Sequence, residues 1–359
     1  MRYSFFYIII LGLFFFSQCK KDDDCGCPPQ PDNETELYYS KDYSMDKTVK
    51  ILQQASKGEG IDIVLIGEAF VDLDMGPGCR YETAMKAAME AFFALEPTKS
   101  FREYFNVYMV YAVSENNVIS DATNTCFGAS AIETPSSIDY NLCYSYAAEA
   151  FDDKDLQDVT IILTVNNLYF RAATHIRLFD NAAIAFSPFL LEYLGELEYT
   201  IIHEAVGHGF AKLADEYGGY DEEFPSDVKE AYLDIWMPQG YWQNIDFTYD
   251  PEKVRWSHFI KHPLYPEVGV FEGGDYYDFG VWHSEEESAM KNFGVHYFNV
   301  RCRELIYKKI KELAGEVYSL EEFLEYDKIN LMTTRSHYPM DVHSDTFFKK
   351  HFPPILQLE

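Results

Sequence analysis

Two histidines and a glutamate stand close together in the segment Ile-Ile-His-Glu-Ala-Val-Gly-His-Gly-Phe, which spans residues 201–210. His203 is followed directly by Glu204, and His208 comes five residues after His203. In the common zinc-hydrolase signature H-E-x-x-H, two histidines four residues apart bind zinc from one helix face, and the glutamate is the general base. The residue types therefore indicate hydrolysis with zinc, although one extra residue separates the histidines.

The extra residue changes which side of a helix each histidine occupies. A regular α-helix turns by about 100° per residue, so side chains four residues apart differ by about 40°, and those five apart by about 140°. Two imidazoles on such different sides could not share one ion. A local π-bulge would absorb the insertion, and Gly207 lacks the side chain that would resist it. We therefore expect a bulge near Val206 and Gly207.

A catalytic zinc site needs a third protein ligand and an open position. Asp215 lies seven residues beyond His208, which corresponds to about 10.5 Å along an unbroken helix and is too far for one ion. If the helix ends near Gly209 and the chain turns back, the carboxylate of Asp215 can complete the set. Glu216 is the second choice for this ligand.

The continuation Leu-Ala-Asp-Glu-Tyr at residues 213–217 resembles the IgA-peptidase family of metzincin-like zinc metalloendopeptidases, some of whose members carry the same insertion. Further blocks similar to this family cover roughly residues 45–315. Two departures are Gly67-Glu68-Ala69-Phe70, where Gly-Asp-Gly-Phe is usual, and His283, where an arginine is common. The similar blocks are residues 58–70, 105–108, 256–259, 271–274, 280–282, 288–290 and 297–299.

This resemblance implies an α/β fold of the zincin or metzincin type. It would combine a twisted sheet and an active-site helix in an N-terminal subdomain with an irregular, mostly helical C-terminal subdomain. It also implies a Zn²⁺ cofactor, with Glu204 as general base, Met290 as an apolar floor beneath the ligands, and Tyr297 as a stabiliser of the developing oxyanion. His258 and His283 are interpreted as cleft or packing residues.

Other interpretations of the motif predict different properties of the protein. The histidines and acidic residues could simply form the solvated face of an acidic protein. An inactive zinc-binding surface lipoprotein with a binding or adhesin role would keep the metal without turnover, but it has no use for a general base at Glu204. A zinc hydrolase of a non-peptide amide would need a closed pocket rather than a groove. A peptidase would instead bind an extended polypeptide along a rim strand, predicted at Ala182–Phe186.

The N-terminus indicates export. The apolar run from Phe5 to Phe16 is too short to span a bilayer and is typical of a signal peptide. Cys19 resembles the lipidated first residue of a bacterial lipoprotein, and the acidic stretch that follows resembles an export tag. We therefore expect an outer-membrane or cell-surface lipoprotein of a Gram-negative bacterium, anchored to the membrane through Cys19. The alternative is a plain secreted protein with an acidic spacer.

Composition excludes one class of partner. The chain has 29 Lys and Arg against 59 Asp and Glu, and the formal net charge of −30 repels phosphate backbones, so nucleic acid is not expected as a partner. With 47% hydrophobic residues among 359, the chain can bury a substantial core. Seven cysteines in an exported chain suggest disulfides, and the pair Cys126 and Cys143 is the first expectation for a bridge.

The spacing of apolar residues and the positions of glycine and proline outline the organisation of the chain. Ile61–Ile66 is a short apolar run between glycines and predicts a buried parallel strand, and Tyr81–Leu95 has helical spacing. Further strands are expected at Phe105–Val113 and Val159–Val165, the active-site helix at Leu190–Lys212 and a late helix at Arg301–Ala314. The expected division is a signal peptide (1–18), a lipidated flexible tether (19–40), a catalytic subdomain with the zinc helix (41–217), a C-terminal subdomain with the Met-turn (218–320) and a tail of unknown role (321–359).

Overall fold

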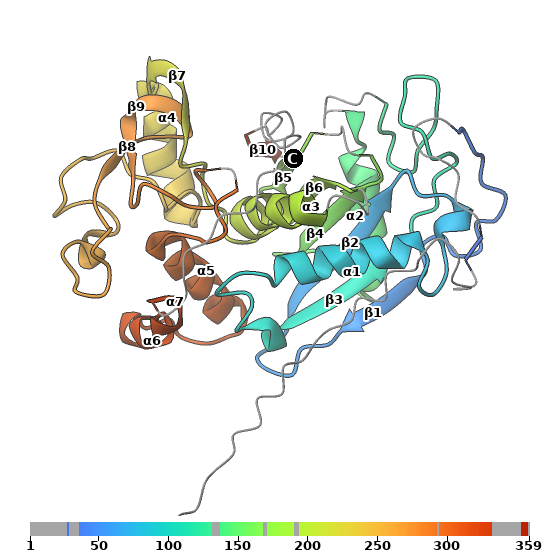
Figure 1. Cartoon of the computed structure of the whole chain (residues 1–359), viewed down its shortest axis with the longest axis horizontal. Coiled ribbons are helices and arrows are strands. Elements are labelled where there is room, and N and C mark those ends of the chain that lie inside the picture. Colours follow the sequence, from blue (N-terminus) through green and yellow to red (C-terminus); the bar gives the residue numbers. More distant parts are fainter. Residues whose placement is uncertain are drawn as a thin grey trace, which may run out of the picture.

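The computed structural model shows an α/β protein with a mixed sheet and helices on both of its faces (Figure 1). The predicted signal segment and Cys19 lie outside the described residues. No helix in the described part of the chain is long and apolar enough to cross a membrane. The structure describes residues 27–28, 36–130, 137–167, 171–189, 194–292, 294–331 and 353–357.

The main sheet has seven strands in the order β1-β3-β2-β4-β6-β5-β10. Strands β3, β2, β4 and β6 are parallel, β1 and β5 are antiparallel to their inner neighbours, and β10 pairs parallel with β5. The strands predicted from apolar runs are confirmed, with small shifts at their ends. The seven strands are β1 (Val49–Gln53), β2 (Ile61–Glu68), β3 (Phe105–Val110), β4 (Thr160–Val165), β5 (Ala173–Arg177), β6 (Ala183–Pro188) and β10 (Ile355–Gln357).

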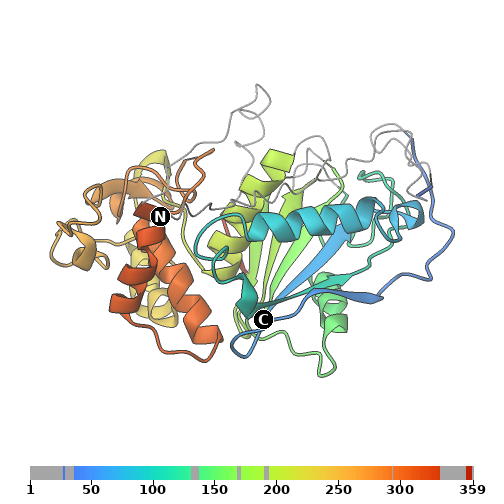
Figure 2. The same cartoon turned by 60° about the horizontal axis from the view of Figure 1, so that its bottom comes forward.

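Both faces of the sheet are buried, because the alternate side chains of β2 enter two different cores. Ile63 and Leu65 belong to the core beneath α1 (Arg80–Phe92) and α3 (Leu194–Ile201). Val64 and Ile66 belong to the core beneath α2 (Tyr140–Ala147) on the opposite face (Figure 2). This two-sided burial explains why β2 is a continuous apolar run rather than an alternating one.

The prediction that Ala182–Phe186 forms a rim strand is wrong. Strand β6, which contains Ala182–Phe186 except for its first residue, lies inside the sheet between β4 and β5. The preceding strand β5 lies outside it, and β10 covers β5 at His175–Arg177. Strand order depends on the path of the connections and not on the hydrophobicity of one segment, so the apolar run alone could not reveal it.

The predicted disulfide between Cys126 and Cys143 is also wrong, because both residues are free thiols. The bridge instead joins Cys27 to Cys79, the residue that precedes α1. The predicted flexible tether is therefore attached to the folded body at Cys27, and it is attached again where the Tyr38 amide donates to the Asn117 side chain. Spacing along the sequence does not report which cysteines meet in space.

The C-terminal part contains a small sheet that the sequence did not predict. Its strands follow the order β7-β9-β8, and β7 (Gly218–Glu223) consists of two glycines followed by exposed polar residues without an apolar face. The late helix predicted at Arg301–Ala314 is confirmed as α5 (Val300–Leu313). The remaining elements there are β8 (Phe271–Gly274), β9 (Tyr276–His283), α4 (Ser226–Ala231), α6 (Leu320–Tyr326), α7 (Lys328–Leu331) and a π-helical turn at Tyr232–Trp236. Short 3-10 turns occur at Asp72–Asp74, Arg102–Tyr104, Ala148–Ala150, Met237–Gln239 and Ser257–Phe259.

The buried His175 on β5 makes stability depend on pH. Its ring stacks on Tyr140 with centroids 3.8 Å apart, and its Nδ1 lies 3.0 Å from the Tyr144 hydroxyl. Burial, together with the charge of Arg177, lowers the pKa of His175 from 6.5 to about 4. Between these values the unfolded chain binds a proton that the folded chain does not, so stability falls as the pH falls from about 6.5 to 4.

We therefore expect His175→Gln to reduce the dependence of the unfolding free energy on pH by up to about 1.4 kcal/mol per pH unit in this range. Urea unfolding at several pH values measures it. Some slope should remain, because burial also lowers the pKa of His283 to about 4. A variant with the full wild-type slope would show that His175 takes no part.

Candidate metal centre

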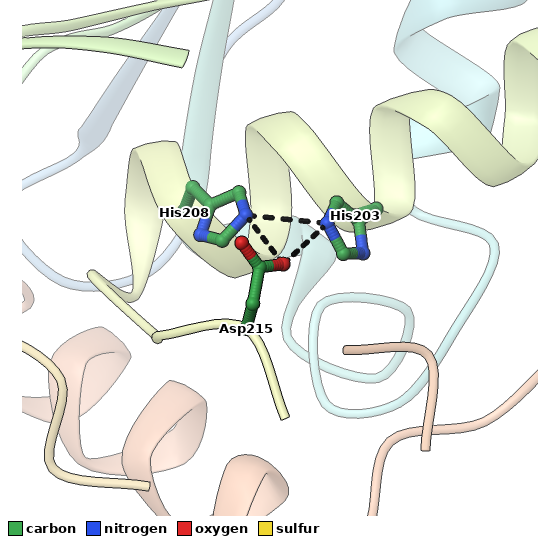
Figure 3. A group of neighbouring side chains, drawn as sticks. All are labelled: His203, His208 and Asp215. Carbon is green, nitrogen blue, oxygen red and sulfur yellow. Dashed lines mark hydrogen bonds and ion pairs between the residues drawn. The ribbon is translucent and has the colours of Figure 1, made fainter. Parts of the chain in front are cut away.

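A π-helix brings the two histidines of the motif together. Helix α3 continues without interruption into the π-helix Ile202–Phe210, and all nine residues of this segment are buried. Because π-helical hydrogen bonds join residues five apart, side chains at this spacing lie on the same side. The Nε2 atoms of His203 and His208 are 3.2 Å apart (Figure 3). The bulge predicted near Gly207 is thus present, but it extends through the whole segment.

The π-helix is fixed by packing at its C-terminal end. The ring of Phe210 lies 6.0 Å from that of Phe92 on α1 and 5.6 Å from that of Phe105 on β3, measured between centroids. The helix ends one residue after Gly209, where the sequence suggested a break, and Lys212 then takes a left-handed conformation. Its ammonium group donates to the carbonyl oxygen of Gly209 and so satisfies an acceptor at the helix end.

The chain turns back after Lys212 and carries Asp215 to the histidines. The backbone amide and carbonyl of Ala214 both bond to the side chain of Asn244, which fixes the turn. Asp215 Oδ1 lies 3.0 Å from His203 Nε2 and 3.3 Å from His208 Nε2 (Figure 3). All three side chains are buried. The structure therefore places Asp215 beside the histidines, as predicted from the possible turn.

The hydrogen bonds around the group leave two imidazole nitrogens and a carboxylate oxygen facing one another. His203 Nδ1 is 2.9 Å from the Ala289 carbonyl oxygen, and His208 Nδ1 is 2.7 Å from that of Leu213. A carbonyl only accepts, so each Nδ1 carries the hydrogen, and the Nε2 atom of each ring faces the other ring and Asp215. Within the described part of the chain, neither oxygen of Asp215 has a hydrogen-bond donor other than these imidazoles. A buried group of this kind could hold a metal cation at its centre.

The charge of Asp215 dominates the titration of this group. Burial disfavours the charged form of His208, but the adjacent carboxylate outweighs it and raises the pKa of His208 to about 9. Burial likewise opposes ionisation of Asp215, yet the two imidazoles hold the pKa of that carboxyl well below its usual range. The carboxylate of Asp215 thus stabilises positive charge on the adjacent imidazole.

Residues after β9 form a floor beneath the histidines. Met290 is fully buried and packs against the π-helix at Gly207, where a Cβ atom would lie 2.8 Å from the methionine Cε. The neighbouring Ala289 supplies the carbonyl that orients His203. The Met290 carbonyl accepts a hydrogen bond from the Glu216 amide. This placement agrees with the apolar floor that the resemblance implied.

Glu216, the second choice for the third ligand, is engaged elsewhere. Its buried carboxylate accepts hydrogen bonds from the amide groups of Asn299 and Asn244, and the Cys302 thiol also donates to it. Because Asn299 caps the start of α5, this network joins the turn that carries Asp215 to the C-terminal helix. Glu216 therefore supports the turn and does not belong to the group of three.

Glu204 and Tyr297 occupy different surroundings. Glu204 follows His203 on the π-helix and is fully buried, and its Oε2 lies 2.7 Å from the hydroxyl of Thr174 on β5. The hydroxyl of Tyr297 donates to Glu287, so the role of Tyr297 as an oxyanion stabiliser stays a prediction. His258 and His283, interpreted as packing residues, bond to Glu304 and to the Gly273 carbonyl respectively.

Sequence reasoning missed three hydroxyl groups near the histidines. The ring of Tyr217 lies 6.5 Å from that of His203, and its hydroxyl donates to Tyr276 at 2.7 Å. Burial and the charge of Asp215 raise the pKa values of both tyrosines, so both stay protonated. Tyr217 could have been noticed because it stands two residues after Asp215. Nothing in the sequence marked Tyr276 or Thr174.

The comparisons with known proteins add one finding. The sequence profile of a family described as IgA Peptidase M64 matches residues 49–265, which include His203, His208 and Asp215. A search of curated proteins gives no match. The matched range contains most of the main sheet, the π-helix and the turn that follows it.

The three-residue group predicts the effect of removing each ligand. We expect His208→Ala and Asp215→Ala to lose at least about tenfold in zinc affinity, because each leaves only two protein donors. His258→Ala is the matched control, since this histidine bonds to Glu304. Metal analysis of the purified variants after dialysis measures the bound zinc per chain. Unchanged zinc content in both ligand variants would exclude this ligand set.

The close packing of Met290 against Gly207 predicts that a side chain at this position would destabilise the protein. A Cβ atom there would overlap the buried thioether of Met290, so we expect Gly207→Ala to lower the free energy of unfolding by about 1–3 kcal/mol. Gly195→Ala in α3 is the control, because its Cβ meets no atom within 4 Å, and it should not destabilise the protein. Combining Gly207→Ala with Met290→Ala should cost less than the sum of the single changes. Additive costs in denaturant unfolding would show that the two residues are not in conflict.

Proposed function

The chain belongs to the IgA peptidase M64 family, and from this premise we propose that it is a zinc-dependent endopeptidase. His203, His208 and Asp215 would hold the metal. The observation that supports this proposal most strongly is the meeting of two imidazole nitrogens and a carboxylate oxygen, all of them buried. Two histidines and one carboxylate are a donor set that suits zinc and leaves a fourth position open.

When bound, zinc supplies Lewis acidity that makes water acidic near neutral pH and polarises a carbonyl group. Glu204 would accept the proton of the attacking water and pass it to the leaving amine nitrogen. Ala289 and Leu213 would keep the two imidazoles in the tautomer that presents Nε2, through their carbonyl oxygens. Tyr297 is retained as the proposed stabiliser of the oxyanion.

The proposed substrate is an extended polypeptide. Family membership supports peptide-bond hydrolysis, but it does not select a particular protein, and immunoglobulin A is not part of the proposal. The formal charge of −30 disfavours polyanionic substrates and nucleic acid. Family membership favours a peptidase over the alternatives of an inactive zinc-binding surface lipoprotein and a hydrolase of other amides.

We also propose export and anchoring through a lipidated Cys19, at the outer membrane or cell surface of a Gram-negative bacterium. The apolar run before Cys19 supports export. The disulfide between Cys27 and Cys79 supports an oxidising compartment, because such bridges are rare in the cytosol.

Glu204 provides the direct test of the proposed chemistry. The zinc-loaded protein should digest an unfolded protein, and Glu204→Gln should reduce this rate by at least about a hundredfold while zinc content stays the same. Glu90→Gln is the matched control, since Glu90 lies on α1 and pairs with Arg102. Gel-based digestion and metal analysis measure both quantities. Equal digestion by wild type and Glu204→Gln would contradict the role of the base.

A further inference from the structure

A hydroxyl from the neighbouring strand bonds to the residue proposed as the general base. Thr174 lies on β5 and is fully buried, as is Glu204. Its Oγ1 is 2.7 Å from the Glu204 carboxylate oxygen Oε2 and 2.9 Å from the Glu204 carbonyl oxygen. A threonine hydroxyl has one hydrogen, so it is shared between the side chain and the backbone of the same glutamate.

The strand that carries this hydroxyl is held on both sides. Thr174 lies opposite Ala185 of β6 in the antiparallel ladder, and the next residue, His175, pairs with Ile355 of β10. The ring of His175 stacks on Tyr140, which further fixes the strand. A β-branched side chain also has few χ1 rotamers. The position of the Thr174 oxygen is therefore set by the sheet and not by the π-helix.

We propose that Thr174 is a positioning residue that holds the Glu204 carboxylate in its working orientation, an inference that rests on the proposed peptidase function. The contact to Oε2 fixes one carboxylate oxygen, and the contact to the carbonyl fixes the same hydroxyl relative to the helix backbone. Together they restrict the side-chain torsions of Glu204. Proton transfer requires the oxygen of the base to lie within hydrogen-bond reach of the water. A carboxylate held in this way spends more of its time in the orientation that meets this requirement.

Thr174 does not take part in proton transfer. The proton that Glu204 takes from the water moves on to the leaving amine nitrogen, and the hydroxyl keeps its own hydrogen throughout. A carboxylate and a protonated carboxyl group both offer an oxygen that accepts this hydrogen. The hydroxyl can thus hold Glu204 before and after the transfer. Valine has nearly the same shape but cannot donate, whereas serine can.

Thr164 provides a matched control on the adjacent part of the sheet. It lies on β4, is fully buried, and its hydroxyl has no hydrogen-bond partner among the described residues. Thr164→Val therefore makes the same chemical change without removing a hydrogen bond. It should leave activity unchanged and should not lower stability.

The test compares Thr174→Val, Thr174→Ser and Thr164→Val in the zinc-loaded full-length chain, with an unfolded protein or a peptide derived from it as substrate. We expect Thr174→Val to lower kcat by about 10- to 100-fold, which is typical for the loss of such a supporting contact. KM should change less than about threefold and zinc per chain should stay the same, because the ligands are intact. Thr174→Ser should recover most of kcat.

A second readout does not depend on activity. In a crystal structure of zinc-loaded Thr174→Val, the Glu204 carboxylate should leave its wild-type position or occupy more than one orientation, while the three ligands stay in place. On the Glu204→Gln background, Thr174→Val should cause little further loss of kcat, because the two residues act as a unit.

Several results would overturn the assignment. Wild-type kcat in Thr174→Val, when Glu204→Gln is inactive, would show that the hydroxyl is dispensable. Unfolding or loss of zinc in Thr174→Val would instead identify Thr174 as structural support for the metal helix. Activity of Glu204→Gln equal to that of wild type would reject the general base itself. That last outcome marks a failure of the proposed function and is distinguishable from a failure of the Thr174 proposal.

Discussion

The candidate site depends on three buried side chains whose potential ligand atoms all lie within 4.8 Å of one another. The Nε2 atoms of His203 and His208 lie 3.2 Å apart, and Asp215 Oδ1 lies 3.0 and 3.3 Å from them. Burying a carboxylate is unfavourable unless it is paired, and a metal cation bound by the two imidazoles would pair it. The five-residue spacing of the histidines then requires a π-helix. Gly207 lets Met290 pack against this helix, because Met290 occupies the space that a side chain at residue 207 would need.

The three residues of the site lie in one segment of the chain, and contacts from both parts of the chain support them. The π-helix lies on the main sheet, with Phe210 packed against α1 and β3, and Thr174 reaches Glu204 from β5. The C-terminal part contributes the Ala289 carbonyl beneath His203 and the Asn299 amide that bonds to Glu216. These contacts join the turn that carries Asp215 to the start of α5.

Sequence reasoning predicted features that depend on local pattern. The buried strands β2 and β4, helices α1 and α5, and the need for a bulge between the histidines all follow from periodicity or spacing. It could not predict what depends on long-range pairing. The inner place of β6, the disulfide between Cys27 and Cys79, and the contact of Thr174 with Glu204 each join segments whose proximity is set by the chain path.

The most direct test of this account is X-ray absorption at the zinc edge of the purified, zinc-loaded protein. The account predicts one zinc per chain, with two imidazole nitrogens at about 2.0–2.1 Å, a carboxylate oxygen at a similar distance and no sulfur. Zinc bound through thiolate sulfur at about 2.3 Å, or coordination by water alone, would contradict it. Either result would mean that the convergence of His203, His208 and Asp215 does not serve to bind the metal.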